Sequence, residues 1–138
     1  MIYLDNSATT PTLEAAAAAA KRYMTEVFYN PASAYRSAVD IEADVEAARR
    51  RLADALTAVP EEIIYTSGGT ESNNIACTGI LRHRRRPAHI VCSAVEHPSV
   101  YQVVMEHKRF GQPASLVGTD TEGRVNLNQL QAALRPDT

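Results

Sequence analysis

Residues 63–74 decide the fold class, and they read Ile63-Ile64-Tyr65-Thr66-Ser67-Gly68-Gly69-Thr70-Glu71-Ser72-Asn73-Asn74. The β-branched run at 63–66 is typical of a short buried strand. Two glycines then form a turn, and apolar residues resume with helical spacing at Ile75, Ile80 and Leu81. The stretch therefore predicts a strand, a glycine turn and a helix, in that order.

The same alternation continues toward the C-terminus. Short apolar runs bounded by glycine or proline predict strands, and three-to-four spacing of apolar residues predicts helices. The expected elements are strands at 89–93 and 114–117, a helix at 100–110 that stops at Gly111, a brief extended piece at 125–127, and a last helix from an Asn128 cap to Leu134. Alternating helices and short, mainly parallel strands indicate an α/β fold.

Two helices are expected before the central stretch. The first runs from a Thr12 N-cap to about Val27 through an alanine-rich segment. A loop at 30–33 contains a proline, which disfavours helical angles in the residue before it. The second helix, at 37–57, is long and amphipathic.

Composition limits the classes of function. The chain has 138 residues, of which 45% are hydrophobic and 22% charged, as in one soluble globular domain. A net charge of −2 gives no basic field for nucleic acid, and the arginine-rich runs at 49–51 and 82–86 are interpreted as solvated helix faces or ends. The alanine run at 15–20 is too short to cross a membrane and no secretory signal begins the chain, so we expect a cytoplasmic protein.

The two cysteines predict neither a metal site nor a disulfide. Cys77 and Cys92 lie in apolar segments without metal-ligand spacing. Buried free thiols are the favoured interpretation over a disulfide.

The glycine turn is a candidate phosphate site. Amide groups at the start of a helix have no intrahelical acceptor and lie at its positive end, and Thr70 adds a hydroxyl donor. Taken alone, an ordinary turn with Thr70 as the N-cap is the simpler interpretation. The segment has no P-loop lysine, and its glycine spacing differs from the dinucleotide fingerprint.

His97 is a second candidate, because it follows the strand expected at 89–93. Ligands of open α/β sheets collect beyond the carboxyl ends of strands, and an imidazole there can stack on an aromatic cofactor or move a proton. A lone loop histidine is more often solvated or a helix cap. That plainer interpretation is kept for His83, His89 and His107.

Four separated segments together resemble the NifS/IscS-like cysteine desulfurases of the class V aminotransferase group, which depend on pyridoxal 5'-phosphate (PLP). The segments are Tyr3-Leu4-Asp5-Asn6-Ser7-Ala8-Thr9-Thr10, Asn30-Pro31-Ala32-Ser33, Thr66-Ser67-Gly68-Gly69-Thr70-Glu71-Ser72-Asn73-Asn74 and Glu96-His97-Pro98-Ser99-Val100. The resemblance implies that 1–138 is a single incomplete domain, with 1–12 an N-terminal arm and 13–138 the N-terminal part of the PLP-binding large domain of fold type I. It also implies an incomplete sheet, in which the strand at 63–66 lacks its family neighbour, so we expect a rearranged or self-associated fold.

The resemblance also implies roles for individual residues. Gly69 and Thr70 match positions that hold the cofactor phosphate, and His97 matches a catalytic histidine that stacks over the pyridine ring and is thought to handle protons. A weaker match is the N-terminal arm near the active site, at Asn6, Ala8 and Thr9. The chain departs from the family at Tyr35, Ala38 and Val39, where a histidine and a Gly-Arg pair are usual.

The activity that the resemblance implies is conversion of L-cysteine to L-alanine, with sulfur passed through an enzyme persulfide to an acceptor protein for iron–sulfur cluster or thiocofactor assembly. Lys21 and Lys108, the only lysines, do not match the family's Schiff-base lysine, and neither cysteine matches its nucleophile. We therefore expect the isolated chain to be inactive, to bind PLP weakly or not at all, and to belong to a homodimer or a self-associated form.

Two other functions remain open. Another class V enzyme, such as a selenocysteine lyase, shares this part of the sequence. A non-catalytic module that binds a partner chain or a phosphate-bearing ligand belongs to a different class. A nucleotide-binding domain is a weak third candidate.

Overall fold

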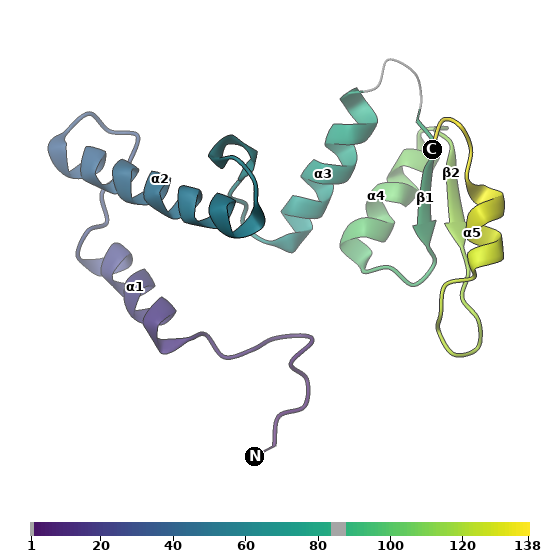
Figure 1. Cartoon of the computed structure of the whole chain (residues 1–138), viewed down its shortest axis with the longest axis horizontal. Coiled ribbons are helices and arrows are strands. Elements are labelled where there is room, and N and C mark those ends of the chain that lie inside the picture. Colours follow the sequence, from purple (N-terminus) through teal and green to yellow (C-terminus); the bar gives the residue numbers. More distant parts are fainter. Residues whose placement is uncertain (1, 84–87) are drawn as a thin grey trace. The chain divides into compact units, whose positions relative to one another are not determined.

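The computed structural model describes residues 2–83 and 88–138 (Figure 1). Its contacts divide the chain into two compact units, Met1–Ile64 and Tyr65–Thr138, here called the N-terminal unit and the C-terminal unit. Each is described by itself. Most of the arginine-rich run expected at 82–86 lies outside the described residues.

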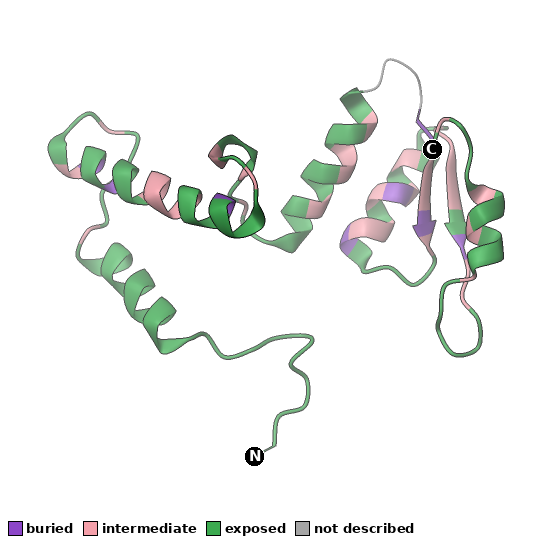
Figure 2. Cartoon of the chain, viewed as in Figure 1, coloured by how far each residue is buried: buried purple, intermediate pink, exposed green. Residues whose placement is uncertain are grey.

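The N-terminal unit contains the two expected helices, α1 (Glu14–Thr25) and α2 (Arg36–Leu56), followed by a 3-10 turn, η1 (Pro60–Glu62). The residue at the N-cap of α1 is Leu13 and not Thr12, and its side chain makes no capping hydrogen bond. No residue of α1 is buried, as the green ribbon in Figure 2 shows. One side-chain hydrogen bond joins the two helices, from the Tyr23 hydroxyl to Asp44 Oδ2 at 2.8 Å.

Three buried residues on α2 form the small core of this unit: Ala38, Ile41 and Ala53. The helix ends at Thr57, whose left-handed backbone (φ 55°) turns the chain so that the Ala58 amide donates to the Ala53 carbonyl at 2.9 Å. Arg49, expected to be solvated, lies half-buried and pairs with Glu46 at 3.1 Å.

The strand expected at 63–66 is absent from the structure, so that prediction was wrong. A β-branched run becomes a strand only when its backbone groups find a neighbouring strand. Here the Ile63 carbonyl instead accepts a hydrogen bond from the Arg49 guanidinium, and Ile64 is 66% exposed. The expectation of an incomplete sheet is confirmed, and self-association remains a prediction.

The C-terminal unit is built on a βαβ arrangement (Figure 1). Its elements are α3 (Gly69–His83), β1 (Ile90–Ser93), α4 (Pro98–Arg109), β2 (Ala114–Val117) and α5 (Leu127–Ala133). The two strands are parallel, with Ile90 beside Ala114 and Ser93 beside Val117. Both strands and the helices predicted around them are therefore confirmed to within one or two residues.

The core of this unit lies where α4 packs on both strands. Val104 of α4 and Val117 of β2 are each 1% exposed, and Cys92 of β1 is buried as well. Burying an apolar side chain of this size contributes about 1.5–3 kcal/mol. On the outer sides, α3 packs on α4 and α5 packs on β2.

Two helix boundaries were decided by side chains or glycine. α4 stops at Gly111 as expected, because this residue adopts a left-handed φ of 74° that suits glycine. The cap of α5 is Asn126 and not Asn128, because the Asn126 side chain accepts a hydrogen bond from the Gln129 amide at 3.0 Å. Of the extended piece expected at 125–127, only Val125 forms a bridge, with Thr119.

His89 is not the solvated or capping residue that its sequence context suggested. It is 3% exposed, and both ring nitrogens lie 2.8 Å from hydroxyls, those of Thr138 and Ser115. Its amide also donates to the Asp137 carbonyl. His89 thus ties the start of β1 to β2 and to residues 137–138.

Candidate functional site

The turn before α3 leaves three amide groups open. In the described structure the amides of Gly69, Thr70 and Glu71 have no backbone acceptor, and the first amide that does is that of Ser72, which donates to the Gly68 carbonyl at 3.1 Å. A Cβ atom placed on Gly69 would meet no other atom within 4 Å. The start of α3 therefore offers an exposed set of donors at the positive end of a helix, which suits a phosphate.

Hydroxyl and carboxylate side chains hold this turn in shape. The Thr66 hydroxyl lies 2.7 Å from the Ser72 hydroxyl and donates to the Gly68 carbonyl. The Glu71 carboxylate accepts from the Ser67 amide at 2.6 Å and from the Ser67 hydroxyl at 2.8 Å. These two bonds, the backbone one first, lower the pKa of Glu71.

Glu71 has a consequence for anion binding. Its negative charge is stabilised at the helix start, and it lies next to the amides that a phosphate would use. A phosphate at Gly69 and Thr70 would have to share this positive end with the Glu71 carboxylate.

His97 forms the N-cap of α4. Its Nδ1 accepts a hydrogen bond from the Ser99 amide at 3.1 Å and lies 2.8 Å from the Ser99 hydroxyl. The residue itself is exposed, so its ring has a face available to a ligand. The capping role, kept as the plainer interpretation of a lone histidine, is therefore confirmed for His97, and it does not exclude a second role.

One hydrogen bond connects the two candidate sites. Asn73, one turn into α3, donates from Nδ2 to the Ser99 hydroxyl at 2.8 Å. The structure thereby brings His97 into one hydrogen-bonded group with the helix that carries Gly69 and Thr70. Asn73 and Ser99 were not among the predicted site residues. The signal that could have indicated Ser99 is its position just after a proline at the start of a helix.

The N-terminal arm belongs to the other unit. Asn6, Ala8 and Thr9 are exposed, and the Tyr3 hydroxyl lies 2.9 Å from the Thr9 hydroxyl. The Ala8 amide donates to the Asp5 carbonyl at 3.1 Å, which closes a local turn. Their approach to an active site remains a prediction.

The thiols and lysines show no sign of an activated nucleophile. Both cysteines are free, as expected, with Cys92 buried and Cys77 partly so. Burial, followed by the charges of Glu96 and Cys77, raises the pKa of the Cys92 thiol and so keeps it protonated. Lys108 is in the last turn of α4, about 16 Å along the helix from His97.

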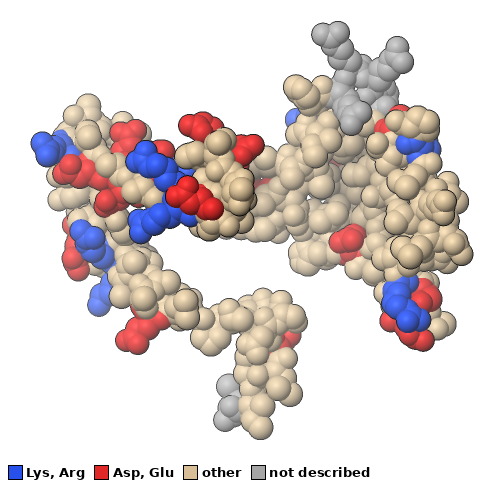
Figure 3. Space-filling model, in the orientation of Figure 1, with Lys and Arg blue, Asp and Glu red and all other residues tan. Residues whose placement is uncertain are grey.

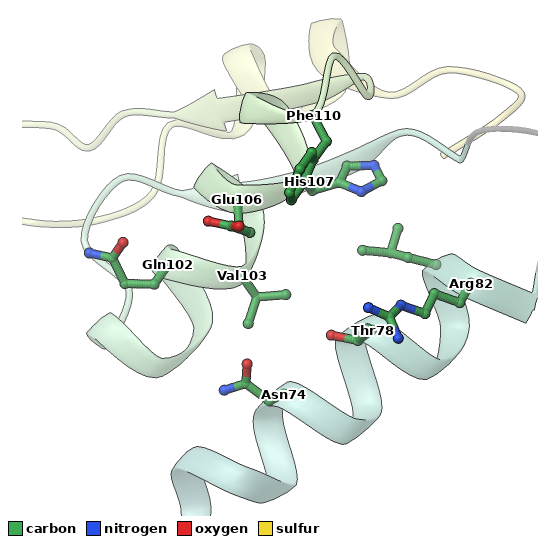
Figure 4. Close-up of a pocket in the computed structure, with 9 residues that line it drawn as sticks. Asn74, Thr78, Arg82, Gln102, Val103, Glu106, His107 and Phe110 are labelled. Carbon is green, nitrogen blue, oxygen red and sulfur yellow. The ribbon is translucent and has the colours of Figure 1, made fainter.

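A groove between α3 and α4 has a volume of about 390 Å³ (Figure 4). Thr78 and Arg82 line it from α3, and Gln102 and Glu106 line it from α4. No predicted site residue lines this groove, which is therefore distinct from the start of α3.

Three further properties of the described residues are potential metal ligands, membrane-spanning helices and surface charge. Residues 2–83 and 88–138 contain no group of three or more potential metal ligands of the His, Cys, Asp and Glu types. In the same part of the chain no helix is both long and apolar enough to span a bilayer. On the face shown in Figure 3, acidic and basic side chains are interspersed along α2.

Comparison with known proteins identifies similar chains. A NifS/IcsS protein homolog of Lactobacillus delbrueckii subsp. bulgaricus is 40% identical over 139 residues, which cover 100% of this chain and 36% of the relative. The cysteine desulfurase IscS of Methylobacillus flagellatus is 41% identical, over 99% of this chain and 35% of its own length. The chain thus spans about a third of the length of these curated relatives.

Solved structures agree with this. A NifS-like protein matches with a TM-score of 0.85 and 29% identity over 96% of this chain, and 37% of that chain is covered. A structure described as SspA in complex with cysteine matches with a TM-score of 0.85 and 30% identity, over 99% of this chain and 40% of its own. These matches confirm the expected α/β fold. Residues 2–138 match the model of the family described as Aminotransferase class-V, and the chain belongs to that family.

Proposed function

We propose that the chain carries part of the cofactor site of a PLP-dependent cysteine desulfurase that converts L-cysteine to L-alanine. Relatives with this name are about 40% identical, and a similar solved structure is described as a complex with cysteine. The observation that carries the proposal is the hydrogen-bonded connection from the open start of α3, through Asn73 and Ser99, to His97.

The start of α3 fits the phosphate of PLP. Three open amides and the Thr70 hydroxyl can donate to a dianion, and the missing side chain of Gly69 leaves room for it. In this proposal Gly69 and Thr70 bind the phosphate, and Ser67 holds Glu71 beside it.

His97 fits the role of a residue that covers an aromatic ring. Its exposed imidazole is anchored through Nδ1, which leaves the rest of the ring accessible to a ligand. Bound PLP would supply an electron sink for the carbon next to the substrate amine. His97 would orient that ring by stacking and would hold a proton at Nε2.

The described site holds only part of what this reaction needs. Lys108 is remote from His97 on α4, Lys21 belongs to α1 of the other unit, and the raised pKa of Cys92 disfavours its thiolate. We therefore propose that the isolated 138-residue chain is inactive and binds PLP weakly or not at all.

The biological setting is part of the same proposal. The relatives named IscS favour a role in sulfur transfer to an acceptor protein for iron–sulfur cluster or thiocofactor assembly. We place the enzyme in the cytoplasm as a homodimer.

The test uses the complete product of the open reading frame that contains this chain. With PLP and L-cysteine, we expect formation of alanine and release of sulfide in the presence of a thiol reductant. Thr70→Val should weaken PLP binding about tenfold or more, because a hydrogen bond to a charged group is lost. Thr78→Val is the matched control, since Thr78 lies on the same helix but lines the separate groove.

Three results would contradict parts of the proposal. Absence of alanine from L-cysteine would refute the desulfurase activity, and turnover of L-selenocysteine alone would identify a selenocysteine lyase. Equal effects of the two threonine variants on PLP affinity would refute the assignment of the phosphate to the start of α3.

A further inference from the structure

We infer that the start of α4 holds neutral His97 in one tautomer, with its proton on Nε2, and that Ser99 and Asn73 are positioning residues for this ring. The inference deepens the proposed function, and its meaning for catalysis rests on that function. The tautomer itself is a property of the described residues alone.

The backbone determines which ring nitrogen carries the proton. The Ser99 amide lies 3.1 Å from His97 Nδ1 and can only donate. The residue before it is Pro98, which has no N–H and a fixed φ, so Ser99 provides the first amide donor of α4. Nδ1 must therefore present its lone pair, and the proton of a neutral ring must be on Nε2.

Two side chains support the same arrangement. The Ser99 hydroxyl lies 2.8 Å from Nδ1 and receives a hydrogen bond from Asn73 Nδ2 at 2.8 Å. Because the Asn73 side chain donates to the Ser99 hydroxyl oxygen, the hydroxyl proton of Ser99 is directed to His97 Nδ1. Ser99 is only 7% exposed, so water competes little for these bonds.

The consequence concerns the exposed edge of the ring. A neutral imidazole has one donor and one acceptor nitrogen, and here the acceptor is already used within the protein. Nε2–H therefore faces a ligand as a hydrogen-bond donor. In this state His97 cannot accept a proton at Nε2, which distinguishes it from a loop histidine that acts as a general base through that atom.

The hydrogen bonds from Asn73 to Ser99 and from Ser99 to His97, here called the relay, also link the start of α3 to the start of α4. Asn73 lies one turn after the amides at Gly69 and Thr70, so a shift of α3 on binding a phosphate would reach His97 through Ser99. Asn73 and Ser99 touch neither a phosphate nor a reacting atom in this scheme. They act through the ring.

The tautomer is measured by long-range ¹H–¹⁵N correlation NMR of the protein labelled with ¹⁵N-histidine, at a pH where the imidazoles are neutral. We expect the Nε2–H form of His97 to exceed the Nδ1–H form by at least about tenfold, the ratio that about 1.4 kcal/mol of hydrogen bonding gives. His83 is the internal control, because it is exposed and no hydrogen bond of its ring occurs among the described residues.

Two substitutions test the relay. Ser99→Ala keeps the backbone donor and removes the hydroxyl, so the excess of Nε2–H should fall about threefold without reversing. Asn73→Ala alone should also lower this excess, but it should have no further effect when combined with Ser99→Ala, because Asn73 acts only through the hydroxyl. Circular dichroism of each variant reports whether the helices persist.

Three NMR results would overturn the inference or part of it. A tautomer ratio at His97 equal to that of His83, whether from an open cap or from loss of α4, overturns the inference, as does a dominant Nδ1–H form. An effect of Asn73→Ala that persists without the Ser99 hydroxyl overturns the relay. No PLP and no turnover enter this measurement, so failure of the desulfurase proposal would leave its result readable.

Discussion

The two units begin their helices differently. In the C-terminal unit, α4 and α5 start with side-chain caps at His97 and Asn126. In the N-terminal unit, α1 and α2 start at Leu13 and Tyr35 without a side-chain cap. The cores differ in the same direction, since Val104 is almost fully buried whereas α1 has no buried residue.

This difference shows that a βαβ unit lets a short chain form a buried core. A helix between two parallel strands can bury its apolar stripe on both of them, so α4 gains a core from neighbours that are close in sequence. The helices of the N-terminal unit have no strand within the described part of that unit to cover them, and apolar side chains such as Met24 and Phe28 stay exposed. The residues with candidate chemistry, Gly69, Thr70 and His97, are in the better packed unit.

The largest effect is expected from a substitution in the core of the C-terminal unit. Val104→Ala should lower its free energy of unfolding by about 2 kcal/mol, because it removes buried methyl groups and leaves a cavity. Met24→Ala in α1 is the control and should change stability by less than about 0.5 kcal/mol, since Met24 is 76% exposed. Urea unfolding followed by the amide signals of β1 and α1 measures both, and equal effects would remove the contrast between the units.

The second prediction concerns the cap of α5. Asn126→Ala should cost about 1 kcal/mol, because the Gln129 amide loses its acceptor. Asn128→Ala, two positions further along in the first turn of α5, should leave the free energy of unfolding nearly unchanged. A larger loss for Asn128 in chemical denaturation would restore the boundary that the sequence suggested.

The third prediction adds a side-chain cap to the N-terminal unit, which has none at the start of α1. Leu13 is exposed and has an extended backbone (φ −59°, ψ 137°) that suits a capping residue. Leu13→Ser should therefore stabilise α1 by about 0.5 kcal/mol and increase helical circular dichroism. Leu13→Ala supplies no acceptor and is expected to give no such gain.

Acid should weaken the turn at 119–125 in the C-terminal unit. The Arg124 amide and then the Arg124 side chain donate to Asp120 and lower its pKa. This stabilisation is complete above the unfolded pKa of about 3.9 and is lost as pH falls below that value and through the lower folded pKa. Amide exchange of the turn measures it, and Asp120→Asn should remove the pH dependence in this window.

Alkali should act on the N-terminal unit instead. The hydrogen bond from the Tyr23 hydroxyl to Asp44 raises the pKa of Tyr23. Its contribution is complete below the unfolded pKa of about 10 and is lost as pH rises through the higher folded pKa. Ultraviolet titration of the tyrosines reports the raised pKa, which should be missing in Tyr23→Phe; an unchanged titration curve in that variant would contradict the assignment.

Parts of the fold could be predicted because their signals are local. Gly111 ended α4 as predicted, because a helix stop depends on residues within one turn of structure. The apolar runs at 90–93 and 114–117 had the local propensity for strands, and they became strands because they pair with each other. The run at 63–66 has the same strand propensity but no neighbouring strand. Helix caps were displaced by one or two residues, since a cap is decided by which side chain reaches an amide.

The site was predicted in part for the same reason. Gly69, Thr70 and His97 stood out through their residue types and their places after expected strands. Asn73 and Ser99 lie 26 positions apart, and no periodicity or spacing indicates that one donates to the other. That contact exists because α3 packs on α4.

The sequence by itself determined the helices, the positions of the runs that can form strands, the glycine turn and the family resemblance, because these follow from short-range propensity and from residue types in order. Only the tertiary structure decided that 63–66 forms no strand in the described structure, that His89 is buried, and that Ser99 and Asn73 set the proton of His97. The physical reason is that strand pairing, burial and directed hydrogen bonds depend on groups distant in sequence, and their positions follow from packing.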